Sequence, residues 1–303
     1  MSGIPTNRTS ITLPTELAQE VLEKTRGASA IMQLARQVNL PGRGLTIPVI
    51  TGDPSAAWVD ETGKKTVSNP TLTQKIMQAY KLAVIVPFSD EFRRDLATLY
   101  DAIVARLPGA LALEFDKTVV GATDKPGENF DNFAAATAQS LIADTGYTAY
   151  NGLVNAYSDI AAAGGVLNGF ALSPAGKGIL LGATDGDGRP LFINSAAEGA
   201  VPVVLGSRVI EGRGVYKSGA AAANASAAGT PAVVGIAGDW TQAVWGTVEG
   251  VQIGFADQAT LEIGTETVHL WQHNMFAIRA EIEVGFRADV NCFNRLTGAV
   301  PVS

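Results

Sequence analysis

The stretch that decides the fold runs from Gly44 to Ser89 and reads GLTIPVITGDPSAAWVDETGKKTVSNPTLTQKIMQAYKLAVIVPFS. Its first arm, Leu45–Thr51, is β-branched and mostly apolar, and its second arm, Lys75–Phe88, is rich in Ile, Val, Leu and Tyr. Apolar runs of this kind between turn-forming clusters are typical of β-strands. The stretch therefore predicts two extended arms of one long hairpin.

The connection between the two arms is long and polar. It contains Asp53-Pro54, the segment Thr62–Lys65 and the segment Ser68–Pro70, which are turn-forming sequences. A loop of this length is uncommon inside a compact domain, and a solitary two-stranded hairpin is marginally stable in water because neither face is covered. We therefore expect a neighbouring subunit to cover the hairpin. The expected inter-subunit contacts are Trp58, Val59, Glu61, Lys64 and Lys65.

The composition is that of a globular chain. Its 303 residues are 47% hydrophobic and 17% charged, with 33 glycines. No apolar run approaches the ~20 residues that a membrane span needs, and the first residues lack the features of a signal peptide. We expect a soluble protein that is not secreted and has no membrane partner.

Charge and cysteine content exclude further classes. A formal net charge of −7 argues against a chain that coats nucleic acid through its own excess of Lys and Arg, although it is compatible with a protein that encloses nucleic acid. Cys292 is the single cysteine, so the chain can build neither a disulfide framework nor a thiolate metal site. A reducing compartment fits this cysteine usage.

Helical periodicity is strongest in three places. Thr15 is a suitable N-cap for a helix over 16–26, and a second short helix is expected over 28–38. The longest signal follows Ser89 and continues to Gly121, with apolar residues mostly in steps of four. Pro108 and Gly109 interrupt this pattern, and an interior proline removes one backbone hydrogen bond, so we expect a helix kink or a break there.

The remaining chain mixes short helices and strands. Helices are predicted over 148–163 and from Ser173-Pro174 through Leu181. Strands are predicted over 170–172, 201–205, 208–210, 233–237 and 248–255, and a short turn from Asp239 through Trp245. The run 275–286 alternates Phe276, Ile278, Ile282 and Val284 with Arg279, Glu281 and Glu283, which predicts a long strand with a register ambiguity around Ala280.

Few residues have the spacing that chemistry requires. His269 and His273 are the two histidines, but no third metal ligand lies near them, so we interpret them as a partly buried polar pair. The Asp185–Pro190 segment lacks the closing Glu of a calcium loop and predicts a surface turn. No nucleophile elbow or phosphate-binding loop occurs, and Cys292 is expected to be buried and inert. We therefore predict no catalytic, cofactor-binding or metal site.

Short motifs follow one another along nearly the whole chain. They are AAWVDE at 56–61, KLAVIVPFS at 81–89, EFDKTVVG at 114–121, NGF at 168–170, LSP at 172–174, DGRPLF at 187–192, GDW at 238–240 and the closing strand at 274–286. In this order they resemble the tailed-bacteriophage major capsid protein family with the Hong Kong 97-type fold.

The resemblance implies an α+β subunit with five parts. They are an N-terminal arm (1–43), an extended β-hairpin loop (44–88), the spine helix of a peripheral domain (89–122), an axial domain (123–266) and C-terminal strands that return to the peripheral domain (267–303). The implied function is that of a major capsid protein, not an enzyme, that self-assembles as hexamers and pentamers into an icosahedral phage head.

The resemblance also implies partners and a location. The partners are copies of the chain itself, a portal, a possible decoration protein and packaged double-stranded DNA that is contacted without sequence specificity. No charged helical prefix precedes the arm, so a scaffolding protein is expected in trans. The expected location is the virion capsid, assembled in the host cytoplasm.

Two alternatives belong beside this interpretation. An encapsulin-type nanocompartment would have the same fold, although the start of the chain does not resemble its cargo-docking helix. The other alternative is a metabolic enzyme with an oligomerisation arm, and the lack of a catalytic motif argues against it.

One branch of the resembled family joins a lysine of the extended loop to an asparagine of a neighbouring subunit. Lys64 or Lys65 with Asn291 or Asn294 would be the candidates here, but we expect no bond because a lysine in a polar tip is hydrated.

Overall fold

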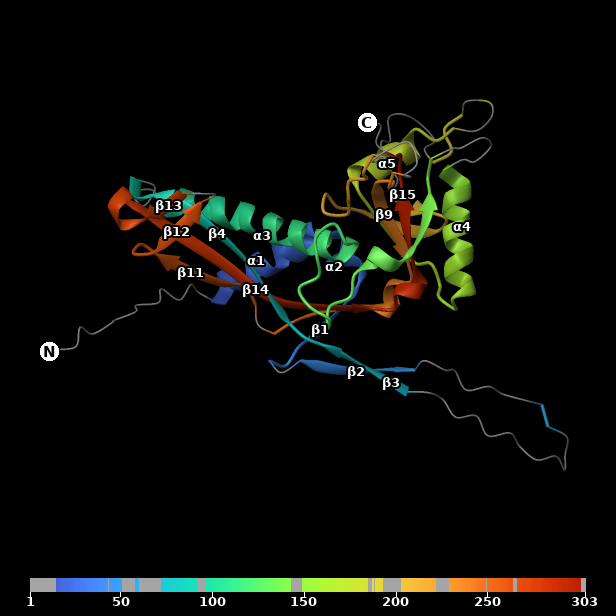
Figure 1. Cartoon of the computed structure of the whole chain (residues 1–303), viewed down its shortest axis with the longest axis horizontal. Coiled ribbons are helices and arrows are strands. Elements are labelled where there is room, and N and C mark those ends of the chain that lie inside the picture. The colour runs from blue at the N-terminus through green and yellow to red at the C-terminus, as the bar shows by residue number, and fades with distance from the viewer. Residues whose placement is uncertain are drawn as a thin grey trace.

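The chain forms an elongated body with two β-sheets and a projecting hairpin. The computed structural model describes residues 15–42, 44–50, 58–59, 72–91, 96–142, 149–184, 187, 189–192, 203–221, 229–248, 250–263 and 266–300. Figure 1 shows one sheet with long helices running beside it, a second sheet at one end of the body, and the hairpin extending away from both.

The first sheet is built around one long strand, β14 (Met275–Ala288). Along one edge it pairs antiparallel with β4 (Tyr80–Ser89). Along the other edge it pairs antiparallel with β11 (Gln252–Ala256) and then with β10 (Ala243–Thr247). The parallel strand β1 (Arg36–Asn39) completes the sheet beside β10. Both edges of β14 are therefore occupied.

One face of this sheet is covered by helices α1 (Thr15–Ala28) and α3 (Leu96–Val120), which run along it in Figure 1. The predicted alternation on β14 is confirmed, and Ala280 belongs to the buried row, which resolves the register. Val21 of α1 and Leu107 and Leu111 of α3 pack on this row. The buried row consists of Phe276, Ile278, Ala280, Ile282, Val284 and Phe286.

The long helix α3 is continuous through Pro108. The chain is therefore not broken at this proline, and a kink at Pro108 and Gly109 stays a prediction. Pro108 is buried and Gly109 is exposed. A Cβ added at Gly109 would meet no atom within 4 Å, so the glycine there is not required by packing.

We predict that Gly109→Ala stabilises the subunit by about 1 kcal/mol, because alanine loses less backbone entropy than glycine in a helix. The measurement is denaturant unfolding of the purified subunit. Gly152→Ala in α4 (Ala149–Ala162) is the matched control, since its added Cβ would collide with the Ser140 carbonyl oxygen and should destabilise. A neutral or destabilising Gly109→Ala would contradict the prediction.

The second sheet has six strands. Helices α4 and α5 (Pro174–Leu181) pack on it, and both were predicted. Ser173 caps α5 by accepting a hydrogen bond from Gly176 N at 3.1 Å. The strand order is β5 (Thr137–Ser140), β15 (Phe293–Thr297), β9 (Val233–Gly238), β6 (Gly169–Leu172), β8 (Ser207–Glu211) and β7 (Val203–Val204).

A cluster of aromatic rings fills the space where the two sheets meet. Phe133 lies 4.5 Å from Phe293 and 5.7 Å from Phe286, measured between ring centroids. Trp240 packs edge-on against Phe293 at 5.2 Å. Because Phe286 belongs to β14 and Phe293 to β15, the same short segment of chain holds both sheets to one core.

Two further pairs of strands lie outside these sheets. β2 (Leu45–Ile50) pairs with β3 (Leu72–Met77) and forms the base of the projecting hairpin. β12 (Thr260–Ile263) pairs with β13 (Glu266–His269) at the far end of the body (Figure 1). Short 3₁₀ helices in the described part of the chain include η2 (Phe133–Ala135), η3 (Trp240–Gln242), η4 (Trp271–His273) and η5 (Val290–Cys292).

Three predicted elements have different bounds in the structure. The second hairpin arm is two strands, β3 and β4, with Gln78-Ala79 between them, so only its first part belongs to the hairpin. The predicted helix over 28–38 shortens to α2 (Ala30–Leu34), because Arg36–Asn39 pairs with β10. The turn after Asp239 ends at Gln242, and Trp245 lies on β10.

The sheets also differ from the proposed division into five parts. β10 and β11 fall within 123–266 but belong to the sheet of β14, and β15 falls within 267–303 but belongs to the six-stranded sheet. The chain thus crosses between the sheets more often than the proposed peripheral and axial bounds imply.

Candidate subunit interface

Trp58, in the connection between β2 and β3, is not covered by the described part of its own subunit. The two strands pair antiparallel from Leu45↔Met77 to Ile50↔Leu72. Beyond them, Trp58 is 105% exposed and so makes little contact with the described part of its own chain, whereas Val59 is 39% exposed. A fully exposed tryptophan on a projecting segment is a common anchor of protein interfaces.

The base of the hairpin, in contrast, is firmly packed. Gly44 has φ +87°, and a Cβ there would lie 2.8 Å from the Met77 carbonyl oxygen, so only glycine fits without strain. Met77 is fully buried and packs in a cluster with Leu40 and Val244. The hairpin therefore leaves the body at a fixed position.

A charged network joins this base to β14. Arg287 donates from Nε to the Ile76 carbonyl at 2.8 Å, from Nη1 to Asp131 Oδ1 at 2.8 Å and from Nη2 to Asn129 Oδ1 at 2.9 Å. Lys75 Nζ donates to the Ala288 carbonyl at 3.1 Å and lies 3.9 Å from Asp131 Oδ2. We call these five residues, Lys75, Ile76, Asn129, Asp131 and Arg287, the hairpin clamp.

Sequence reasoning missed the clamp. Arg287 and Asp131 are 156 residues apart, and no spacing or motif connects them. Arg287 was visible only as a charged residue at the end of the alternating run that became β14.

We predict that Arg287→Lys weakens the clamp by about 2 kcal/mol, because lysine keeps the charge but cannot make three hydrogen bonds in a planar fork. Hydrogen exchange of the amides in β3 should rise, and the subunit should unfold at lower denaturant concentration. Arg279→Lys is the control, since Arg279 is an exposed arginine of the same strand whose ion pair with Glu281 adds little. Equal effects of the two variants would contradict the role of the clamp.

A second polar joint holds the N-terminal helices against α3. Asp116 is 1% exposed and accepts hydrogen bonds from Ser29 Oγ at 2.5 Å, Ala30 N at 3.0 Å and Ile31 N at 3.4 Å. It therefore caps α2 together with Ser29, which is the N-cap residue. A Cβ at Gly214 would lie 2.5 Å from Asp116 Cβ, so the loop after β8 closes over this joint.

Burial raises the pKa of the Asp116 carboxyl to about 7, although the hydrogen bonds from Ser29, Ala30 and Ile31 lower it in part. Because this pKa is higher in the folded than in the unfolded chain, the folded state binds more protons between about pH 4 and pH 7. The contribution of Asp116 to stability is therefore full below pH 4 and is lost as the pH rises to 7.

We predict that Asp116→Asn removes the loss of stability that ionisation of Asp116 causes as the pH rises. The difference in unfolding free energy, variant minus parent, should increase from pH 5 to pH 8, by at most on the order of 4 kcal/mol. Glu114→Gln on the same helix makes the same chemical change at a part-exposed position and controls for the loss of one charge. A relative stability of Asp116→Asn that does not vary with pH would contradict the prediction.

The other predicted residues have simpler surroundings. Glu61, Lys64 and Lys65 lie outside the described residues. Asn291 is exposed and donates to Asp289, whereas Asn294 is buried and donates from Nδ2 to Asp159 Oδ2 at 2.9 Å. Asn294 therefore helps to hold α4 against β15, a structural use of this side chain.

The histidines and the cysteine carry no visible chemistry. His269 and His273 are both exposed, so the predicted partial burial is wrong; η4 and the isolated β12–β13 pair leave them at the surface. Cys292 is buried as predicted, and desolvation raises the pKa of its thiol, with Asp289 and Asp239 contributing. Among the described residues, no group of three His, Cys, Asp or Glu side chains could hold a metal ion.

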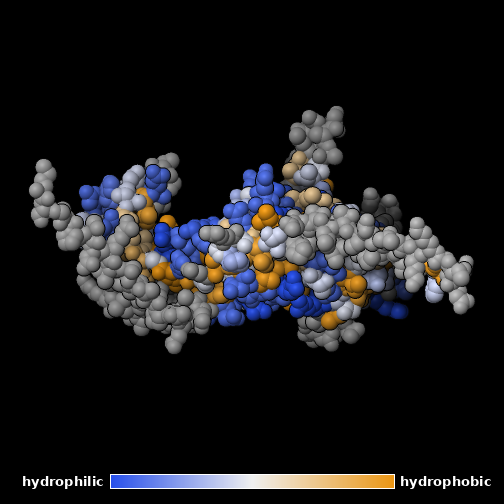
Figure 2. Space-filling model, turned by 90° about the horizontal axis from the view of Figure 1, so that it is seen from below, coloured by the Kyte–Doolittle hydropathy of each residue, from blue (hydrophilic) through white to orange (hydrophobic). Residues whose placement is uncertain are grey.

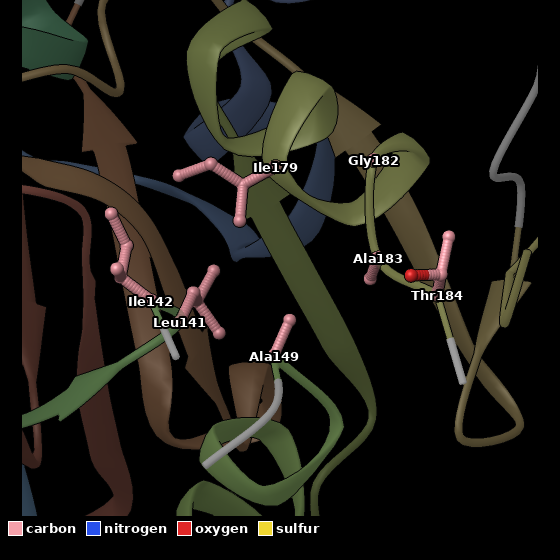
Figure 3. Close-up of a pocket in the computed structure, with 7 residues that line it drawn as sticks. All are labelled: Leu141, Ile142, Ala149, Ile179, Gly182, Ala183 and Thr184. Carbon is pink, nitrogen blue, oxygen red and sulfur yellow. The ribbon is translucent and has the colours of Figure 1, made fainter. Parts of the chain in front are cut away.

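One of the cavities is poor in reactive groups. One cavity of about 340 Å³ lies between the end of β5, the start of α4 and the end of α5 (Figure 3). The described residues that line it carry no ionisable side chain, and Thr184 supplies the only hydroxyl among them. In the described part of the chain, no helix has the length and apolar character that crossing a membrane requires.

Comparisons with known proteins agree with this geometry. A family model described as the phage capsid family matches residues 9–289. The chain is 34% identical over 301 residues to the probable major capsid protein gp17 of Mycobacterium phage L5, covering 94% of this chain and 89% of that protein. It is 31% identical over 309 residues to the protein of the same description from Mycobacterium phage D29, covering 95% and 90%.

Solved structures support the fold. A chain from Gordonia phage Cozz matches with a TM-score of 0.69 at 24% identity, covering 90% of this chain and 87% of that one. A chain from the capsid of an empty GTA particle computed with C5 symmetry matches with a TM-score of 0.62 at 15% identity, covering 90% of each.

The solved structures show the Hong Kong 97-like α+β fold, and the family model and the curated relatives define the class as structural capsid proteins. The chain belongs to the phage capsid family. The expected family, fold class and capsid role are thereby confirmed, and the nanocompartment alternative is not favoured.

Proposed function

We propose that this chain is the major capsid protein of a tailed phage and that its copies form hexamers and pentamers that close into an icosahedral shell around double-stranded DNA. The observation that carries the proposal is the hairpin, which is clamped at its base by Arg287 and has a fully exposed Trp58 beyond its strands. A segment with a fixed base and an uncovered end is suited to reach across to a neighbouring copy.

The rest of the molecule fits a repeated head-to-tail contact. A hairpin that contacts a different part of the neighbouring copy would make a heterologous contact, which forms rings when its rotation closes. Figure 2 shows the molecule from below, and the coloured part of this face mixes hydrophilic and hydrophobic residues, which suits several smaller contacts between copies.

The proposal includes further partners. Many copies that share one kind of contact can close into shells of several radii. The size of the shell would therefore be set by a scaffolding protein that acts in trans. A portal would occupy one vertex, and a decoration protein is compatible with the fold. The packaged DNA would be contacted without sequence specificity, and the net charge of −7 is compatible with a shell that encloses DNA without coating it.

The proposal also places the chain in the virion after assembly in the host cytoplasm. It assigns no enzymatic activity to the chain. This part rests on the structural role of the family.

The decisive variant is a deletion of residues 52–69. Because the clamp and both sheets lie outside this segment, the deleted subunit should stay folded and soluble, with an unchanged circular dichroism spectrum. Electron microscopy and sedimentation should show that it no longer forms shells. Shells of normal size and yield from the deleted chain would refute the role of the hairpin.

A further inference from the structure

A cavity with two arginines lies where the first sheet approaches the second. It has a volume of about 450 Å³ and lies between β1, the end of α2, β8 and η3. The described residues that line it are Leu34, Arg36, Asn168, Arg208, Trp240 and Thr241, and we call it the arginine cavity.

The two arginines of the arginine cavity form no ion pair with the described acidic residues. Arg36 and Arg208 are both exposed, and neither forms an ion pair with a described carboxylate. Arg208 donates from Nη2 to the carbonyls of Gln33 and Leu34, at 3.2 and 3.3 Å, which fixes its position against α2. The cavity therefore presents two guanidinium groups that a carboxylate or phosphate could bind.

The nearest acid, Asp239, is already satisfied. It accepts hydrogen bonds from Val166 N at 3.0 Å, Asn168 Nδ2 at 2.9 Å, Thr241 N at 3.0 Å and Thr241 Oγ1 at 2.6 Å. Four donors on one carboxylate leave little capacity for a further strong bond to an arginine. Leu34 and Trp240 supply the apolar part of the lining, and Asn168 and Thr241 add uncharged polar groups.

We propose that the arginine cavity is the receiving site for the hairpin tip, residues 51–71, of a second copy of this chain. This inference rests on the proposed function and adds the residues that receive the hairpin. In the sequence, the exposed pair Trp58-Val59 is followed directly by Asp60-Glu61. An aromatic anchor beside two carboxylates matches a cavity with two arginines and an apolar wall.

The length of the tip supports this assignment. Residues 51–71 connect the end of β2 to the start of β3, and half of a connection of this length, about ten residues, can span at most roughly 30 Å, which is enough to reach a neighbouring copy. The other described cavities match the tip less well. That of Figure 3 is lined by no charged residue, and those near Glu114 and Glu211 are lined by acids as well as by a base.

Cysteine cross-linking tests the proposal directly. Cys292 is the single natural cysteine and is buried, so two introduced cysteines would be the reactive ones. Val59→Cys is combined with Thr241→Cys on the rim of the arginine cavity. The control combines Val59→Cys with Thr184→Cys in the cavity of Figure 3. Shells are treated with a short bifunctional maleimide and run on a denaturing gel.

The expected result is a ladder of covalent multimers with Thr241→Cys and none above background with Thr184→Cys. Shells of the first variant without a ladder, or equal ladders from both pairs, would overturn the proposal. The parent chain must first form shells. If it does not, the proposed function fails, and this outcome is distinct from shells that form but do not cross-link.

Charge reversal gives an independent readout. Arg36→Glu should raise the subunit concentration needed for assembly by about tenfold, and Glu61→Lys in the same chain should restore most of it. Arg213→Glu, at another exposed arginine, is the control and should leave assembly unchanged. Reversal of Arg36 that lowers only the DNA content of otherwise normal, cross-linked shells would mean that the site binds phosphate, and would overturn the assignment to the hairpin tip.

Discussion

Every backbone N–H and C=O group along β14 has to find a partner, and most of the molecule is arranged around this requirement. β4 occupies one edge of the strand, and β11 and β10 occupy the other. Alternate side chains of β14 then need an apolar cover, which α1 and α3 provide. The hairpin depends on the same strand, because its clamp uses Arg287 near the end of β14. A long strand paired on both edges gives the hairpin a base that cannot slide.

The base of the hairpin is held in place, whereas Trp58 beyond it is exposed. Association costs translational and rotational freedom as well as the ordering of loops, so an interface element that is already positioned loses less on binding. The clamp and Gly44 supply this positioning at the base of the hairpin. Trp58 stays exposed beyond the paired strands. A contact with another copy through Trp58 would therefore require little further ordering at the base of the hairpin.

Much of the fold could be predicted from the sequence because its signals are local. The periodicity of α3, the N-cap at Ser173 and the alternation on β14 each depend on residues a few positions apart. The position of the hairpin was also predicted, from the contrast between two apolar arms and a polar connection. The contacts expected of Glu61, Lys64 and Lys65 stay predictions, because a contact with a neighbouring copy is not fixed by the properties of one chain.

The parts that could not be predicted depend on distant partners. Arg36–Asn39 continues a helical apolar pattern, yet it is a strand because β10, some 200 residues later, offers an open edge. The division of the second arm into β3 and β4 has the same origin, since β4 pairs with β14 and β3 with β2. The clamp and the joint at Asp116 each unite polar residues from separate parts of the chain. Local propensity cannot reveal these choices, because the competing pairings differ in tertiary contacts and not in the segment itself.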